Sequence, residues 1–544
     1  MDGTNFFTRV KIPLSVSTVT TKRTNTMIDF KFDLQRFVAT KLTQDMFPAN
    51  YTGDVGADSP IKLESLDYFR SVDRDADGNP TGSRHQYAVY CYVLEAGSYT
   101  LSQDLNLDRP ILIKGDVTLD LNGHTITRTI PEVTKDACDW QAYNKNSYFE
   151  SFDKEDFALN AICIQGDGSL NLSDSSTLQT GKVTTQHGKL GNCNMGTIQI
   201  EEQGSFTMTS GTVEGADVAV KIDSTGTIDI SGQDTTISSQ EDDIWLSFRS
   251  AATVNITDAK LASYRNAIFA VPSKEIDGVN DITLSGIKLV NISDNADDPE
   301  RENVGGILIA NKDNLTLINT TIHGSVSHQG GGNLTIKDCN ITNDQGAVEV
   351  SSGTVATIEN STIESAKNVG VQVTNGASLT ISGDTSISAD SYFGMWNSGG
   401  SVTMNGGTVT GSLGWYAVRN YNGGSFELND GLLFSDLGIA FINEKSSITV
   451  NGGKISGVAG LLNSAGEANI CDGTVEATVA GYGLKNEGGS LTVSGGTITS
   501  NGSNAIRNLD VEVGVGERVV NEDHMLVYTQ FETVPDCRQK ASFK

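Results

Sequence analysis

The sequence is poor in proline, which accounts for 9 of its 544 residues, whereas glycine accounts for 58. Collagen-like chains and proline-rich disordered chains both need abundant proline, so the composition excludes them. Basic residues are also scarce, because 38 Lys and Arg face 67 Asp and Glu, giving a net charge of −29. Binding to phosphate backbones and to anionic membrane surfaces depends on clustered Lys and Arg. We therefore expect no nucleic-acid partner and no membrane-surface partner.

Cysteine pairs and long apolar runs are missing as well. A zinc site or a disulfide framework would need closer cysteine spacing than this chain has, so we expect mostly free thiols. The seven cysteines are Cys91, Cys138, Cys163, Cys193, Cys339, Cys471 and Cys537. No run approaches the roughly 18 apolar residues of a membrane span, so membrane insertion is not expected. Residues 1–26 lack the apolar core and cleavage site of a signal peptide. Export would then use a route not visible in the sequence, or the true start differs, since Met27 opens a new segment.

What the sequence does contain is a repeat of short alternating runs, apolar-polar-apolar-polar, which is strand periodicity. Clear copies start 22, 23, 23, 24, 22, 20 and 23 residues apart, at Leu334, Ala356, Leu379, Val402, Phe426, Ile448, Ala468 and Leu491. Looser copies start at Val117, Leu170, Phe206, Ile228, Val254, Ile282 and Leu315. Glycine, Asn and Asp mark the turns, as in the Asn-Gly-Gly sequences at Asn405 and Asn451.

A second register of asparagines runs in phase with these runs. Its members are Asn375, Asn397, Asn420, Asn443, Asn463, Asn486 and Asn508. A mostly apolar pair stands two and four residues before each, so those positions should point inward and positions −1, −3 and −5 outward. With a third short strand after the Gly-Gly turn, each coil of about 22 residues holds three strands. We predict an all-β parallel β-helix solenoid in which the asparagines form a structural ladder.

The opening coils carry a family resemblance. The run YTLSQDLNL from Tyr99, followed by VTLDLNGHTI from Val117, resembles right-handed parallel β-helix proteins of the pectin-lyase-like type. The resemblance covers roughly residues 93–515, and it implies the fold. It leaves the activity open, because that superfamily includes lyases, hydrolases, phage tailspikes and non-catalytic adhesins. The regular coils after residue 330 look most like the repeats of bacterial surface adhesins. We assign residues 1–92 to an N-terminal attachment or capping region and residues 516–544 to a C-terminal cap or tail.

Exposed aromatic residues suggest a sugar-binding face. Tyr392 and Trp396 on one coil, and Trp415 and Arg419 on the next, take outward positions relative to the asparagines. Tyr392 and Trp415 share position −5, so they should stack along the axis. A row of rings beside polar groups suits the faces of sugar rings, although packing under a loop or against another subunit would also explain it.

One acidic cluster suggests an enzyme. Aligning the pair Val218/Val220 with Ile244/Leu246 places Asp217 over Asp243 on adjacent coils. The cations Lys221 and Arg249, with Trp245, would lie close by. Paired carboxylates about 5 Å apart could cleave a glycosidic bond, or bind calcium for elimination from uronates. Solvated acids with local cationic partners explain the same residues, and we favour that interpretation. The signatures of polygalacturonases are not present as a set.

A separate loop, DRDADGNP from Asp73, begins like a calcium-binding loop through Asp73, Asp75 and Asp77. Arg84 stands where the bidentate glutamate would be, and an Asp-Gly hairpin turn is the interpretation that we favour. We therefore expect no cofactor, with calcium as the alternative.

Three functions follow as hypotheses. The leading one is a non-enzymatic, secreted or cell-surface protein, adhesin-like, with a polysaccharide or cell-surface glycan as partner. The second is a polysaccharide lyase or glycoside hydrolase. The third is a phage tailspike, in which the chain would form a homotrimer on the virion.

Overall fold

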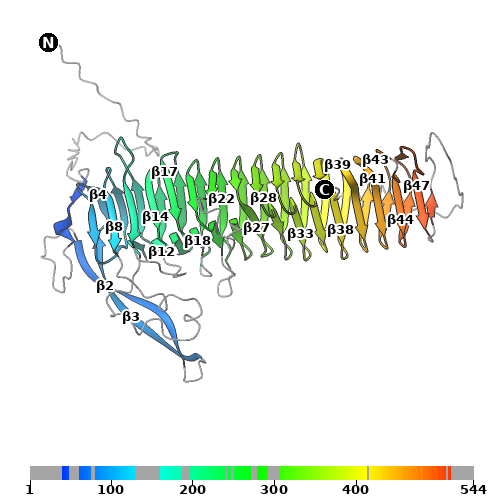
Figure 1. Ribbon diagram of the computed structural model, residues 1–544. Coiled ribbons are helices and arrows are strands. Elements are labelled where there is room, and N and C mark those ends of the chain that lie inside the picture. Colours follow the sequence, from blue (N-terminus) through cyan, green and yellow to red (C-terminus); the bar gives the residue numbers. More distant parts are fainter. Residues whose placement is uncertain are drawn as a thin grey trace, which may run out of the picture. The chain divides into compact units, whose positions relative to one another are not determined.

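The chain folds into a parallel β-helix, shown as a computed structural model in Figure 1. The structure describes residues 39–47, 61–74, 80–129, 160–186, 196–216, 218–240, 242–246, 250–270, 278–291, 305–412, 416–479, 481–509 and 513–515. Within the stack of coils, strands pair in parallel with the strand one coil further along, as β7 (Asp116–Asp120) does with β10 (Ser169–Ser173). Three stacked sheets result, which we call sheets 1, 2 and 3 in the order in which each coil meets them.

Sheet 1 contains the strands that open each coil. Besides β7 and β10 they are β1 (Thr40–Leu42), β4 (Gly97–Leu101), β13 (Ser205–Met208), β16 (Thr227–Ser231), β19 (Thr253–Thr257), β22 (Asp281–Ser285), β25 (Asn314–Ile318), β28 (Asn333–Lys337), β31 (Val355–Glu359), β34 (Ser378–Ser382), β40 (Ser447–Val450), β42 (Glu467–Ile470), β45 (Ser490–Val493) and β48 (Val513–Val515).

Sheet 2 follows the first turn of each coil. It comprises β5 (Leu105–Leu107), β8 (Thr125–Thr129), β11 (Lys182–Gln186), β14 (Gly211–Gly215), β17 (Thr235–Ser239), β20 (Lys260–Ser263), β23 (Lys288–Asn291), β26 (Thr321–His323), β29 (Asn340–Asn343), β32 (Thr362–Ser365), β35 (Ser386–Ala389), β43 (Thr474–Ala477) and β46 (Thr497–Ser500).

Sheet 3 completes the coil. It comprises β6 (Ile111–Ile113), β9 (Ile162–Ile164), β12 (Gly196–Glu202), β15 (Val218–Ser224), β18 (Asp242–Leu246), β21 (Asn266–Ala270), β24 (Gly305–Ile309), β27 (Ser325–His328), β30 (Val348–Val350), β33 (Val371–Thr374), β36 (Met395–Ser398), β38 (Val418–Tyr421), β44 (Leu484–Glu487) and β47 (Ile506–Leu509). Three longer strands turn corners: β37 (Ser401–Gly411) joins sheets 1 and 2, β39 (Ser425–Glu444) runs through all three, and β41 (Lys454–Ser464) joins sheets 2 and 3.

The predicted repeat is confirmed residue by residue in sheet 1. Each predicted start lies opposite the next one, from Val117 with Leu170 to Ala468 with Leu491. The intervening pairs follow the same order without a break. The alternating apolar residues of the sequence therefore form continuous columns along the axis.

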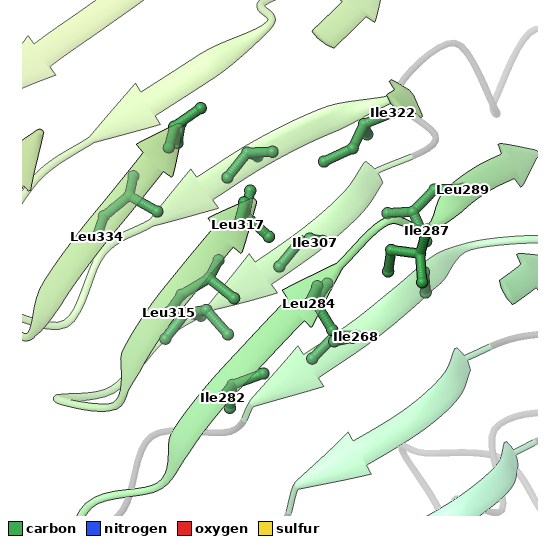
Figure 2. Close-up of a cluster of buried hydrophobic side chains, with 14 of the residues drawn as sticks. Ile268, Ile282, Leu284, Ile287, Leu289, Ile307, Leu315, Leu317, Ile322 and Leu334 are labelled. Carbon is green, nitrogen blue, oxygen red and sulfur yellow. The ribbon is translucent and has the colours of Figure 1, made fainter. Parts of the chain in front are cut away.

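The inward columns make the core. Figure 2 shows the adjoining rows around Ile282, Leu315 and Leu334, which are register partners on successive coils. Each of these side chains is at most 1% exposed. Full burial of one such aliphatic side chain stabilises the fold by about 1.5–3 kcal/mol, and every coil contributes several of them.

The Asn-Gly-Gly turns explain the glycine content. Gly407 has a φ of 86°, and a Cβ on it would lie 2.4 Å from the carbonyl oxygen of Thr385. The equivalent glycine of the next coil, Gly431, has a φ of 104° and approaches the carbonyl of Gly407 in the same way. Glycine is thus required at these turns by both backbone conformation and the close stacking of coils.

The asparagine ladder is present from Asn397 onward. The Nδ2 of each ladder residue donates to the Oδ1 of the next, at 2.8 Å from Asn397 to Asn420, 2.9 Å to Asn443, 2.7 Å to Asn463, 2.6 Å to Asn486 and 2.8 Å to Asn508. The same amides donate to turn carbonyls, as Asn443 does to Ser446 at 2.9 Å. The asparagines therefore hold turns together.

The prediction that Asn375 belongs to the ladder is wrong. Val373, two residues earlier, is the register partner of Asn397. The inward column therefore changes from aliphatic residues to asparagine at Asn397, with Val350 and Val373 before it. Asn375 is exposed in the following turn, where its φ of 52° is one that asparagine tolerates.

The segment before residue 93 contributes to the solenoid. β1 pairs in parallel with β4, so the stack of coils begins at Thr40, inside the region predicted to be a cap. The predicted strands around the Asp-Gly loop form an antiparallel pair, β2 (Ile61–Arg74) and β3 (Pro80–Leu94), and the end of β3 joins sheet 3 through β6. The predicted cap or tail at 516–544 lies outside the described residues.

Most of the described cysteines form no disulfide, in line with the prediction of mostly free thiols. Cys91, Cys163 and Cys339 are buried thiols outside any disulfide. Cys471 is disulfide-bonded, and its partner lies outside the described residues.

Candidate functional site

The outward side chains of sheet 3 form one column along the axis. Because inward and outward positions alternate along a strand, the residues between the core positions of sheet 3 share this face. In chain order they are Gln199, Lys221, Trp245, Phe269, Leu308, Ser327, Glu349, Gln372, Trp396 and Arg419, each the register partner of the next. We call this set the outer column. Both clusters predicted from the sequence have members in it.

The outer column carries an aromatic and cationic group on β36 and β38. Trp396 is half-buried, and its ring stacks on Tyr421 with a centroid distance of 5.6 Å and an interplanar angle of 20°. Arg419, its neighbour on the next coil, lies 4.9 Å from the Tyr421 ring centroid. Glu444 lies on the coil after that of Arg419 and binds its guanidinium. The Oε2 atom of Glu444 is 2.9 Å from Nε and 2.8 Å from Nη2 of Arg419. This group, Gln372, Trp396, Arg419, Tyr421 and Glu444, is the Trp396 cluster.

The other predicted sugar-binding residues have different outcomes. Tyr392 is half-buried and lies against Phe393, with ring centroids 3.9 Å apart. Trp415 lies outside the described residues, so its stacking on Tyr392 stays a prediction. A second coil-to-coil stack, besides Trp396 on Tyr421, is Phe393 on Tyr416, with centroids 5.5 Å apart and an interplanar angle of 11°.

A polar pocket of about 220 Å³ adjoins this cluster on the preceding coils. Its walls come from β27 and β30, from the turns at Asn343–Gly346 and Asn368–Val369, and from Gln372 of β33. Glu349, a member of the outer column, is part of its lining, and one of its oxygens accepts hydrogen bonds from the Ser327 hydroxyl and the Gln329 amide, each at 2.9 Å. Gln372 belongs to both the pocket lining and the Trp396 cluster, so the two form one surface.

Sequence reasoning missed the pocket. The turns between sheets 2 and 3 vary in length and have no periodicity, so Asn343 and Asn368 gave no signal. Glu349 could have been predicted as an outward residue, because it stands between the apolar, buried Val348 and Val350 in the sequence.

The predicted alignment that placed Asp217 over Asp243 is wrong. The register pairs Val218 with Asp242 and Val220 with Ile244, two residues away from the alignment that placed Asp217 over Asp243. Asp217 and Arg249 lie outside the described residues. Lys221 does lie near Trp245, with Nζ 5.7 Å from the ring centroid.

Asp243 itself does not face solvent. It is fully buried, and burial raises the pKa of its carboxyl well above the usual range. Neither of its carboxyl oxygens makes a hydrogen bond of ordinary geometry with a described residue, although the Ser239 hydroxyl and the Ala262 N–H lie nearby and offset part of the shift. A carboxyl in this position has no access to a polysaccharide, so Asp243 is not a catalytic candidate.

The calcium hypothesis is not tested. Asp73 lies in β2, whereas Asp75 and Asp77 lie outside the described residues. Within the part of the chain that the structure describes, no group of three or more His, Cys, Asp and Glu side chains is arranged to hold a metal ion.

The comparisons with known proteins support the fold. Residues 196–386 match the family model described as the right handed beta helix region. Together with the stacked coils, the match agrees with the resemblance to pectin-lyase-like parallel β-helices. No curated protein matches the chain, and no solved structure matches it. In the described residues there is no helix of the length and apolar character needed to cross a membrane.

Proposed function

We propose that this chain is a non-enzymatic, secreted or cell-surface β-helix protein that binds a glycan along sheet 3. The observation that carries the proposal is the continuous surface formed by the polar pocket and the Trp396 cluster. It combines a half-buried indole, a second aromatic ring and a fixed guanidinium with amide and carboxylate groups. Aromatic faces bordered by hydrogen-bonding groups suit sugar rings, which present apolar faces and hydroxyl edges.

The charges of the surface favour a neutral or amino sugar. The pocket lining includes the carboxylate of Glu349 and, among these described residues, no Lys or Arg. Arg419 is already engaged by Glu444. A polyuronate or sulfated glycan would therefore bring negative charge against Glu349 without an available cation, which disfavours it.

Binding is favoured over catalysis by the number of carboxylates. Most glycosidases use a pair of carboxyl groups, one on each side of the scissile bond. The pocket supplies one, and that one is hydrogen-bonded to Ser327 and Gln329.

The test is a glycan array followed by calorimetric titration of the full chain. We expect binding to neutral or amino-sugar glycans, weakened about tenfold or more in Trp396→Ala, because interface tryptophans commonly carry a large share of the binding energy. Thr380→Ala is the matched control, since Thr380 is a partly exposed outward residue of sheet 1. Unchanged binding by Trp396→Ala would reject the site.

Two further measurements separate the alternatives. Release of reducing ends or unsaturated uronates, abolished by Glu349→Gln, would replace the binding proposal with a hydrolase or lyase. A trimer in light scattering, rather than a monomer, would favour the tailspike.

A further inference from the structure

The disulfide at Cys471 lies near the C-terminal end of the solenoid. Cys471 follows Ile470, the last residue of β42, at the turn between sheets 1 and 2. Its N–H donates to the carbonyl oxygen of Val450 on the preceding coil at 2.8 Å, so its backbone is fixed in the stack. Because the buried Ile470 points inward, the alternation places Cys471 on the outer surface, where it is half-buried. The disulfide therefore joins the outside of the solenoid to another part of the chain.

The reach of the chain identifies the partner. Three of the other six cysteines lie outside any disulfide, so the candidates are Cys138, Cys193 and Cys537. Cys138 stands nine residues after Thr129, the end of β8, and an extended chain of that length spans at most about 32 Å. Thirteen register steps separate the coil of β8 from the coil of Cys471, roughly 62 Å at the spacing of neighbouring strands. Cys138 is therefore too far away.

Cys193 is excluded in the same way. It stands three residues before Gly196 of β12, which keeps it within about 11 Å of that strand. Its coil, which β10 opens, is twelve register steps from the coil of Cys471, roughly 58 Å. Cys537 stands 22 residues after Val515. Val515 is only two register steps from Ile470, about 10 Å, so Cys537 is within reach.

A second observation concerns the open end of the solenoid. The last strands of sheets 2 and 3 are β46 and β47, near the end of the stack in Figure 1, and no described strand follows either one. Ile498 of β46 has Val475 as its neighbour on the preceding coil and none among the described residues on the other side, yet it is only 1% exposed. Ala505, just before β47, is 6% exposed. β48 extends sheet 1 alone, so the burial of these side chains calls for a further cover beyond the last coil.

We propose that Cys471 is joined to Cys537, and that this disulfide holds residues 516–537 over the open end as a covalently fastened cap. Val515 and Cys471 lie at the same corner, between sheets 1 and 2, and on the last coil β46 follows that corner. A segment that leaves at Val515 and returns to Cys471 therefore has both of its ends beside the edge of β46. The segment contains the apolar run Met525–Tyr528, which suits such a cover. An uncovered strand edge pairs readily with another chain, and the cap would prevent this.

The disulfide also bears on the compartment in which the protein acts. When it forms, the two thiols lose two protons and two electrons, and a new S–S bond joins them. By thiol–disulfide exchange the electrons and protons pass to the disulfide of a protein oxidant or of glutathione, whose S–S bond breaks to give two thiols. Disulfides form and persist in oxidising environments such as the cell exterior. The proposal is thus in keeping with a secreted or cell-surface protein, and it does not depend on glycan binding.

Peptide mass spectrometry tests the pairing. The full chain, produced by secretion, is alkylated in denaturant without a reductant, and the monomer band of a non-reducing gel is digested with trypsin. Cys471 and Cys537 fall on separate peptides, 455–485 and 519–538, with one cysteine each. We expect these peptides as one linked species that separates on reduction. Alkylated Cys471, or its link to the peptide of Cys138 or of Cys193, would overturn the pairing.

Hydrogen exchange tests the cap. Cys471→Ser and Cys537→Ser should behave alike, with exchange of the β46 and β47 amides faster by roughly tenfold or more, because the segment is no longer tied down. Cys339→Ser is the matched control, since Cys339 is a buried thiol outside any disulfide, and it should leave β46 and β47 unchanged. Wild-type exchange rates in β19 show that the solenoid of each variant is intact. Unchanged exchange in β46 and β47 of both variants overturns the cap, even where the linked peptides are found.

Discussion

At the scale of single residues, the molecule shows how a polar side chain can serve as core. Asn420, Asn443 and Asn463 are all 0% exposed, yet each amide is hydrogen-bonded along the axis and to a turn. A buried amide is costly when it lacks partners, and it is tolerated when its donors and acceptor are satisfied. The ladder therefore stabilises the turn between sheets 3 and 1 only while it is continuous.

We expect Asn443→Ala to destabilise the solenoid by about 3 kcal/mol, because it leaves Asn463 Oδ1 and a turn carbonyl without their donor in a buried site. Asn375→Ala is the matched control, since it removes the same amide from a turn outside the ladder. Its cost should be about 1 kcal/mol, from the positive φ. Hydrogen exchange of amides in the surrounding coils, with thermal melting, measures both. Equal effects would show that the ladder contributes nothing specific.

At the scale of turns and strands, the glycine turns set the distance between coils. Gly407 and Gly376 both have positive φ, at 86° and 76°. They differ in space: a Cβ at Gly407 would meet the Thr385 carbonyl at 2.4 Å, whereas one at Gly376 would meet nothing within 4 Å. Comparing alanine substitutions at these two glycines therefore separates the cost of backbone strain from the cost of a steric clash with the neighbouring coil.

We expect Gly376→Ala to cost about 1 kcal/mol, from the left-handed conformation alone. Gly407→Ala should cost about 3 kcal/mol, because the methyl group must also displace the neighbouring coil. Thermal melting of the two variants under identical conditions tests the difference. If Gly376→Ala melts at or below the temperature of Gly407→Ala, coil-to-coil contact is not what selects glycine at Gly407.

The two errors of prediction in sheet 3 have one physical cause. The predicted place of Asn375 in the ladder and the predicted alignment of Asp217 with Asp243 each differ by two residues from the observed register. A two-residue shift preserves which side chains point inward, because the period of a strand is two. Alternation thus determines the face on which a residue lies, and it does not determine the coil-to-coil partner. In sheet 1 the Gly-rich turns supplied that information, and every predicted start was placed correctly.

The candidate site was predictable only in part for the same reason. Trp396 and Arg419 follow from outward phase beside the asparagine ladder, and the structure makes them register neighbours. The pocket around Glu349 depends on turns whose lengths differ from coil to coil.

At the scale of the whole molecule, the solenoid is nearly one-dimensional. Each coil contacts the coils before and after it, so stability is approximately a sum of coil terms and interface terms. Removing one complete coil should then shorten the molecule without disturbing its columns. Residues 444–463 are such a unit, because Asn443 and Asn463 are register partners, as are Glu444 and Ser464.

Deletion of residues 444–463 joins Asn443 to Ser464, which puts Asn443 where Asn463 stands, next to Asn486. We expect this variant to fold and to melt within a few degrees of wild type, since it loses one coil and one interface. Deletion of residues 444–462 differs by a single residue, yet it retains an extra asparagine and reverses inward and outward positions at the junction. It should expose apolar residues and melt at a much lower temperature, with early cleavage near the junction in limited proteolysis. If the two deletion variants melt at similar temperatures, the coils can change their register freely. The columns of inward side chains are then a result of packing and do not determine it.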